Sequence, residues 1–226
     1  MVADKEQIMI ESQLKVVGKI LSAFSHELNN HLAVIKESAG LIEDILNFNK
    51  SFKGAGKENL KAFQSIENHI TNTSWLCEQL GNFGHKMDEP LASFDVNESI
   101  NELLVLLGRI AKQKGIIFEK DFQDNVPLIY SNPSKLQFLI FCFIDKNLNR
   151  FERNGTIIFK TSYSHSSITI KILTRGEVTE TGERDICPDE IHEYVARRLR
   201  GNIVREDGGI AITLPVSISS EADAHD

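Results

Sequence analysis

The sequence predicts an α+β protein in which a long antiparallel helical hairpin precedes an α/β sandwich. Three observations support this fold class. Apolar residues recur at heptad spacing through the first ninety residues, glycines interrupt that repeat once, and helical and strand-like periods alternate after Pro90. We expect the hairpin over 1–88, the sandwich over 92–217, with helices on one sheet face, and a polar, acidic, disordered tail over 218–226.

The hairpin is predicted from two heptad runs. In the first, two neighbouring columns carry the repeat: Leu14, Leu21, Leu28, Ile35 and Ile42 in one, and Val17, Phe24, His31, Ser38 and Ile45 in the other. Residues 47–57 form the turn, and a second run ends near Gly81 and Gly84. Because a lone hairpin cannot cover its own apolar stripe, we expect a homodimer that forms a four-helix bundle.

The second half of the chain mixes helices and strands. Helical spacing predicts a helix over 96–114, and Asn132-Pro133 is a start signal for another over 134–149. A third helix is expected over 189–200. Strands are predicted at 116–122, 156–163, 168–172 and 210–216.

Composition narrows the function. Hydrophobic residues make up 41% and charged residues 25% of 226 residues, which is typical of a globular protein. A formal net charge of -7 argues against nonspecific binding to nucleic acid or to anionic membranes. There is no apolar run of roughly 18 residues and no apolar core of a secretory signal near the N-terminus, so a cytoplasmic location without membrane contact is expected.

Three cysteines, Cys77, Cys142 and Cys187, lie far apart in the sequence and form no C-x-x-C pair. We therefore expect neither a disulfide framework nor a cysteine-based zinc site, and no other metal site. Cys142 falls in an apolar helix and is expected to be buried and inert.

The candidate site lies on the first helix. With Leu28 at heptad position a, His26 takes position f and Asn30 position c, so both lie away from the seam on one exposed face. An exposed imidazole beside the carboxylate of Glu27 can act as a nucleophile, and the amide of Asn30 can position a water or a phosphoryl oxygen. For an arbitrary helix, a solvated His-Glu pair would be the simpler interpretation.

The segment SHELNNHLAVI resembles the H-box of two-component histidine kinases. The resemblance implies that His26 takes the phosphoryl group, that Glu27 is the base, and that Asn30 supports dephosphorylation of the partner. Many members have Pro after the Asn, whereas this chain has His31 at a d position, which we interpret as a packing histidine.

Residues 94–141, 154–173 and 208–216 resemble the ATP-binding domain of the same kinases, but its nucleotide motifs are missing. The two N-box asparagines align with Cys142 and Lys146, and a charged lysine cannot bind Mg²⁺. The segment 174–178 replaces the Asp-x-Gly-x-Gly box, and no later Gly-x-Gly box precedes the helix at 189. ATP binding is therefore expected to be absent, and the chain to need no cofactor.

The whole chain thus resembles the ChpT-like histidine phosphotransferases, which are built on a histidine-kinase plan. The resemblance implies an enzyme that passes phosphoryl groups between receiver aspartates through His26, with Mg²⁺ supplied by the receiver. Expected partners are response-regulator receiver domains and a hybrid histidine kinase. Two alternatives stay open. One is a divergent ATP-dependent kinase that uses Asp145, Asn147 or Asn149, and the other is a non-catalytic scaffold or receiver phosphatase.

A docking face for the receiver follows from the helix geometry. A receiver must bring its aspartate to His26, so the b and e positions that flank this face should line the contact. These positions are occupied by Lys15, Gly18, Ser22, Ser25 and Asn29.

Overall fold

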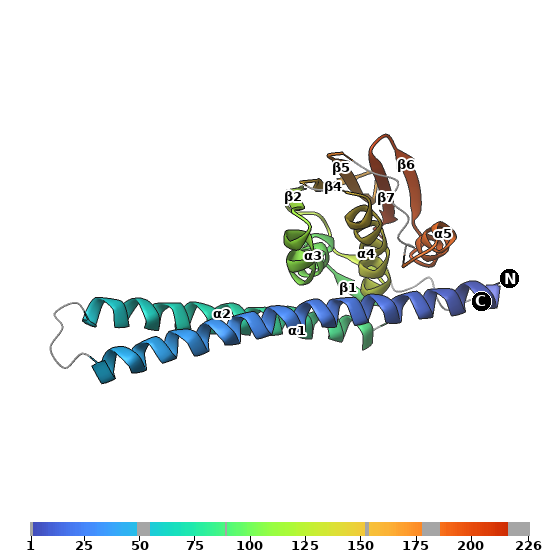
Figure 1. Ribbon diagram of the computed structural model, residues 1–226. Helices are drawn as coiled ribbons and strands as arrows, with labels where there is room; N and C mark the ends of the chain where they lie inside the picture. The colour runs from blue at the N-terminus through green and yellow to red at the C-terminus, as the bar shows by residue number, and fades with distance from the viewer. Residues whose placement is uncertain (1, 49–54, 89, 152–153, 178–185, 217–226) are drawn as a thin grey trace.

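A computed structural model describes residues 2–48, 55–88, 90–151, 154–177 and 186–216. It confirms the α+β class: two long helices pair as an antiparallel hairpin, and a sheet covered by helices on one face lies against one half of that hairpin (Figure 1). The loop end of the hairpin extends well beyond the sheet domain. The predicted tail at 218–226 lies outside the described residues.

Helix α1 spans Val2–Phe48 and helix α2 spans Ala55–Asp88. The second helix continues past Gly81 and Gly84, near which the heptad run ends, and Phe83 between them is buried in the core. The first helix begins well before Leu14, and its early residue Met9 is buried as well. Both extensions are stabilised by packing rather than by the heptad repeat.

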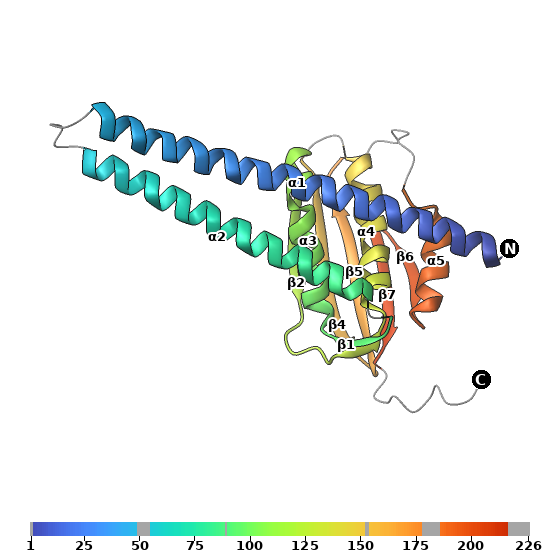
Figure 2. The same ribbon diagram turned by 90° about the horizontal axis from the view of Figure 1, so that it is seen from below.

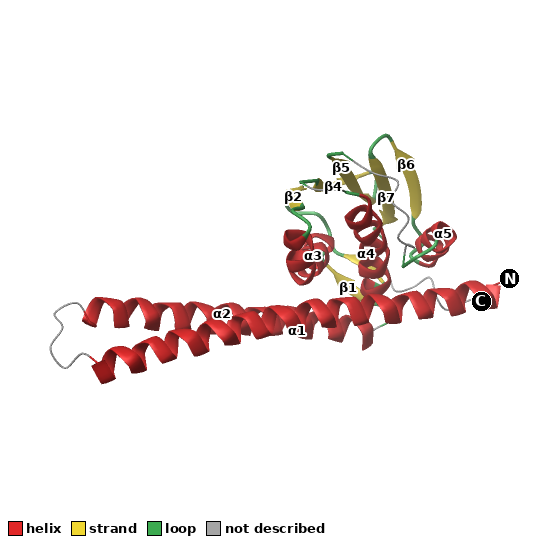
Figure 3. Ribbon diagram, in the orientation of Figure 1, coloured by secondary structure: helices red, strands yellow, loops and turns green. Residues whose placement is uncertain are grey.

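The second part of the chain contains a five-stranded sheet in the order β2-β4-β5-β7-β6 and a separate β1-β3 pair. Only β2 and β4 pair in parallel; the other neighbours are antiparallel. Figure 3 shows that the helices of this second part lie between its sheet and the hairpin. The elements are β1 (Ala92–Phe94), α3 (Val96–Gln113), β2 (Ile117–Phe122), β3 (Ile129–Ser131), α4 (Pro133–Arg150), β4 (Thr156–Ser164), β5 (Ser167–Arg175), α5 (Asp189–Arg198), β6 (Asn202–Glu206) and β7 (Gly209–Pro215).

Two side-chain caps start the helices that matter for the site. The Asp95 carboxylate accepts hydrogen bonds from the backbone of Asn97 and Glu98 at the start of α3. Asn132 caps α4 in the same way, and Pro133 occupies the first turn, as the sequence predicts. The core then forms where alternate residues of β4 and β5 face α3 and α4; it includes Leu103, Leu107, Leu139, Ile144, Ile157, Phe159, Ile168 and Ile170.

The hairpin and the sheet domain meet along one face of α1. Val16 and Ile20 are buried there, and the Ser12 hydroxyl donates to the Ile186 carbonyl oxygen over 3.1 Å. Lys19 forms an ion pair with Asp145 of α4, whose side chain is only 1% exposed. Seen from below, α1 crosses α3 and α4 and reaches α5 (Figure 2). The helix that carries His26 is therefore fixed to the sheet domain by apolar and ionic contacts.

A different face of the hairpin has no cover from the residues that the structure describes. Large apolar side chains remain about half exposed along it: Ile10, Leu14, Leu21, Leu32 and Leu46 on α1, and Phe63 and Ile70 on α2. We call these residues the open apolar stripe. Soluble proteins rarely leave so long an apolar surface bare. None of the helices described has an apolar window long enough to cross a membrane.

Candidate functional site

His26 and Asn30 lie on one exposed face of α1, one helical turn apart, as the heptad frame predicts. Glu27 points elsewhere and is only partly exposed, because successive side chains on a helix do not face each other. In the described part of the chain, no hydrogen bond or ion pair joins Glu27 to His26. The structure therefore brings the imidazole and the amide together and places the carboxylate on an adjoining face.

Glu27 is held by the sheet domain. Arg109 of α3 donates from Nη1 to Glu27 Oε2 over 2.8 Å. The other carboxylate oxygen, Oε1, lies 3.8 Å from His31 Nε2 on the next turn. His31 in turn shares a 2.8 Å hydrogen bond between its Nδ1 and that of His69 on α2, consistent with a packing role. Both oxygens of the expected base are thus occupied by groups other than His26.

A cavity of about 550 Å³ lies between the hairpin and α3, directly beside this contact. Glu27 and Asn30 line it from α1, Trp75 from α2, and two cations, Arg109 and Lys112, from α3. The sequence analysis missed Arg109 and Lys112. Arg109 is half-buried and Lys112 exposed on this amphipathic helix, and the sequence does not show what faces them, because the contact depends on how the two domains dock. The cavity therefore places the Arg109–Glu27 ion pair and the Lys112 cation beside Asn30.

The five expected docking residues are all exposed or open on one face of α1. They are Lys15, Gly18, Ser22, Ser25 and Asn29. A Cβ added at Gly18 would meet nothing within 4 Å, so this face is open for close approach. The face turns away from the contact with α3 and α4 and lies next to His26.

On α4, the polar residues that could serve a nucleotide are committed to other contacts. Lys146 donates to Asp189 Oδ1 over 2.7 Å, and Asn147 donates to the Phe143 carbonyl of its own helix over 2.7 Å. Asp145 pairs with Lys19, and Asn149 Oδ1 accepts from Lys114 over 3.1 Å. A slip of one residue in the N-box alignment would bring Asn147 into place; its amide nitrogen is used within α4, and its Oδ1 is the atom that could bind Mg²⁺.

In histidine kinases, the adenine-reading aspartate would follow the strand that corresponds to β5. At the end of β5, the polar side chains are bound to other parts of the sheet domain. The Thr174 hydroxyl donates to the Gly208 carbonyl oxygen over 2.9 Å, and Arg175 pairs with Glu119 over 2.7 Å. The residues from Val178 to 185, which contain most of the short segment at the place of an ATP lid, lie outside the described residues.

Two of the cysteines that lie far apart in the sequence meet in the fold. Cys142 and Cys187 come together with His192, all three buried, whereas Cys77 is exposed on α2. Burial raises the pKa of the Cys142 thiol, and the hydrogen bond from that thiol lowers the pKa of Cys187. Cys142 and Cys187 are 45 positions apart in the sequence, so spacing rules for metal sites do not detect this cluster.

No family model matches the chain, and no curated protein sequence matches it. Among solved structures it is similar to the Acinetobacter baumannii histidine kinase AdeS, with 16% identity over 85% of this chain and 98% of that one, and a TM-score of 0.47. The catalytic domain of histidine kinase ThkA gives 16% identity, 57% and 97% coverage, and a TM-score of 0.49. A complex of ThkA with the response regulator TrrA gives 14% identity, 95% and 66% coverage, and 0.47. Likeness at this level says nothing of activity.

Proposed function

We propose that this chain is a histidine phosphotransferase of a two-component phosphorelay, which passes phosphoryl groups between receiver aspartates through His26 and does not use ATP. The observation that carries the proposal is a contrast within one molecule. The His-Glu-x-x-Asn residues are intact, with His26 and Asn30 on an open face, whereas the polar residues of α4 are bound to protein partners.

The chemistry needs little beyond positioning. A nitrogen of the His26 imidazole attacks the phosphorus of a receiver aspartyl phosphate; the N–P bond forms as the P–O bond to the aspartate breaks, and the carboxylate leaves with the electron pair. The reverse reaction on a second receiver completes the relay. The receiver's own Mg²⁺ would neutralise the phosphoryl charge.

Arg109 and Glu27 set the electrostatics of this step. The imidazole becomes positive as the N–P bond forms, and a nearby carboxylate would stabilise that charge. In this conformation Arg109 holds the Glu27 carboxylate away from His26. Full activity therefore requires Glu27 to leave Arg109 when a receiver docks, and Arg109 then becomes free to face the acidic partner.

A homodimer fits the open apolar stripe. Its leucines recur at intervals of 7, 11 and 14 residues, which keep them near one face of α1, and α2 adds Phe63 and Ile70. A second hairpin packed on this stripe would complete a four-helix bundle. Gly18 and Ser25, in the same heptad column as Leu32, would lie at the edge of this interface, and Lys15, Ser22 and Asn29 farther from it.

The test of ATP independence is incubation of the purified chain with Mg²⁺ and γ-labelled ATP, beside the His26→Ala variant and a parallel titration of Mg-ATP binding. We expect no label on either protein and no binding at millimolar nucleotide. Label on the wild type alone would make the chain an ATP-dependent kinase. A stable complex with phosphorylated receivers without transfer would instead favour a scaffold.

A further inference from the structure

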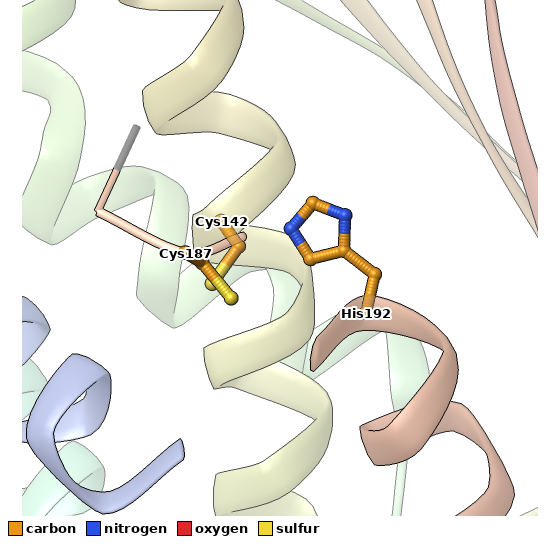
Figure 4. A group of neighbouring side chains, drawn as sticks. All are labelled: Cys142, Cys187 and His192. Carbon is orange, nitrogen blue, oxygen red and sulfur yellow. The ribbon is translucent and has the colours of Figure 1, made fainter. Parts of the chain in front are cut away.

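A second group of reactive side chains lies away from His26, between α4 and α5. Cys142 projects from α4, Cys187 precedes α5 by two residues, and His192 lies on the second turn of α5. The two sulfurs and one imidazole nitrogen all lie within 4.8 Å of one another, and each residue is at most 3% exposed. Figure 4 shows the two sulfurs side by side, with the ring nitrogen farther from the backbone, Nε2, on their side of the imidazole.

The imidazole of His192 is unsatisfied. Within the described part of the chain, neither of its ring nitrogens has a hydrogen-bond partner, although the side chain is 3% exposed. Burying a polar group without a partner costs free energy, and native proteins rarely leave such groups without a partner. A ligand that binds Nε2 would remove this cost.

The acidic residue behind the ring completes the arrangement. Asp189 Oδ1 lies 3.6 Å from His192 Nδ1, and Figure 4 shows Nδ1 as the ring nitrogen farther from the two sulfurs. Lys146 and Arg205 each hold the Asp189 carboxylate at 2.7 Å, so its position is fixed. Metal-binding histidines usually have a carboxylate next to the ring nitrogen that does not bind the metal, here Nδ1, because the carboxylate fixes the ring orientation and its tautomer.

We propose that Cys142 Sγ, Cys187 Sγ and His192 Nε2 bind one thiophilic d¹⁰ metal ion, Zn²⁺ or Cu⁺. Two thiolates and an imidazole suit both ions, with metal–sulfur distances of about 2.3 Å and metal–nitrogen distances of about 2.0 Å for zinc. Atoms already within 4.8 Å of one another need only small side-chain movements to reach those distances. Binding releases the two thiol protons to solvent, so charge and protons balance.

A disulfide between the two cysteines explains less. It would join the sulfurs but leave both nitrogens of His192 buried and unpaired. The metal uses all three groups, and it assigns a role to the carboxylate of Asp189. The bound ion would also tie α4 to α5 and to the segment at Ile186, whose carbonyl oxygen accepts from Ser12 of α1. This inference is independent of the proposed phosphotransfer.

The test is a titration of the chelator-treated, reduced chain with Zn²⁺, and anaerobically with Cu⁺, followed by metal analysis after dialysis. We expect one ion per chain in the wild type and in the Cys77→Ser control, and at least a hundredfold weaker binding in Cys187→Ser and His192→Gln. Co²⁺ substitution should give sulfur-to-metal charge-transfer absorption that Cys187→Ser weakens. The tighter-binding ion identifies the metal.

The proposal would be overturned if the reduced wild type retained neither ion, or if Cys187→Ser retained as much as Cys77→Ser. If a variant fails to fold, the metal titration of the wild type alone decides whether the chain binds one ion. The unfolding temperature gives a second readout: metal should raise it for the wild type and for Cys77→Ser, and an equal rise in His192→Gln would also contradict the site.

Discussion

The ion pair between Lys19 and Asp145 fastens the helix that carries His26 to the sheet domain, and its removal is predicted to destabilise the whole chain. Lys19 precedes His26 by one heptad on the same helix. The Asp145 side chain is 1% exposed, and its other nearby donor, Asn149 Nδ2, is 3.5 Å away. The Lys19→Met variant would therefore leave the buried Asp145 carboxylate without its cationic partner.

Breaking a buried pair from one side costs about 3–5 kcal/mol. The Lys19 side chain is 30% exposed, so water can reach the site, and we expect a loss of about 3 kcal/mol in the free energy of unfolding. Adding Asp145→Asn removes the stranded charge and should restore most of that loss. The double-mutant cycle should then give a coupling energy of about 2 kcal/mol.

Urea unfolding at pH 7 measures all four free energies. The matched control is Lys15→Met, an exposed lysine one turn earlier, which should change stability by no more than about 0.5 kcal/mol. Two results together would contradict this account of how the sheet domain is held to α1. Lys19→Met would change the free energy of unfolding no more than Lys15→Met does, and the effects of Lys19→Met and Asp145→Asn on that free energy would be additive.

Three further predictions concern the site. Arg109→Gln should raise the initial rate of His26 phosphorylation about fivefold, because the partly exposed ion pair with Arg109 stabilises the bound position of Glu27 by about 1 kcal/mol. A lower rate would refute this, and so would an equal increase in the Arg109→Gln/Glu27→Gln double variant. Lys15→Glu should weaken receiver binding about fivefold at low salt and less at high salt, measured by calorimetry beside Lys61→Glu on α2. Leu21→Glu should convert the proposed dimer to a monomer, with a loss of about 3 kcal/mol in the free energy of association from two copies of one leucine. An unchanged mass by light scattering would count against the bundle.

Much of the fold is encoded locally and could be predicted. The start of α4 follows from Asn132-Pro133, and the alternation of 168–172 marks a strand with one buried face. The strands that were missed lack such signals: β1 and β3 have three residues each, and β6 is almost fully exposed, so no alternation marks it. The first turns of α1 lie outside the heptad frame because they pack on the sheet domain instead.

The candidate site divides in the same way. The positions of His26 and Asn30 follow from helix periodicity alone. The engagement of Glu27 by Arg109 does not, because the two residues are 82 positions apart and meet only when the domains dock. The cluster at Cys142 depends likewise on tertiary packing, and spacing rules for metal sites cannot detect it.

The most direct test of the account is phosphoryl transfer from a labelled receiver. Receiver domains charged with labelled acetyl phosphate would be mixed with the chain in Mg²⁺, and the product tested for acid-labile phosphohistidine and mapped by mass spectrometry. We predict label on His26 of the wild type and of His165→Gln, an exposed histidine in the turn between β4 and β5, and none on His26→Ala. Equal labelling of His26→Ala, or label mapped to another residue, would contradict the assignment of His26 as the phosphoacceptor.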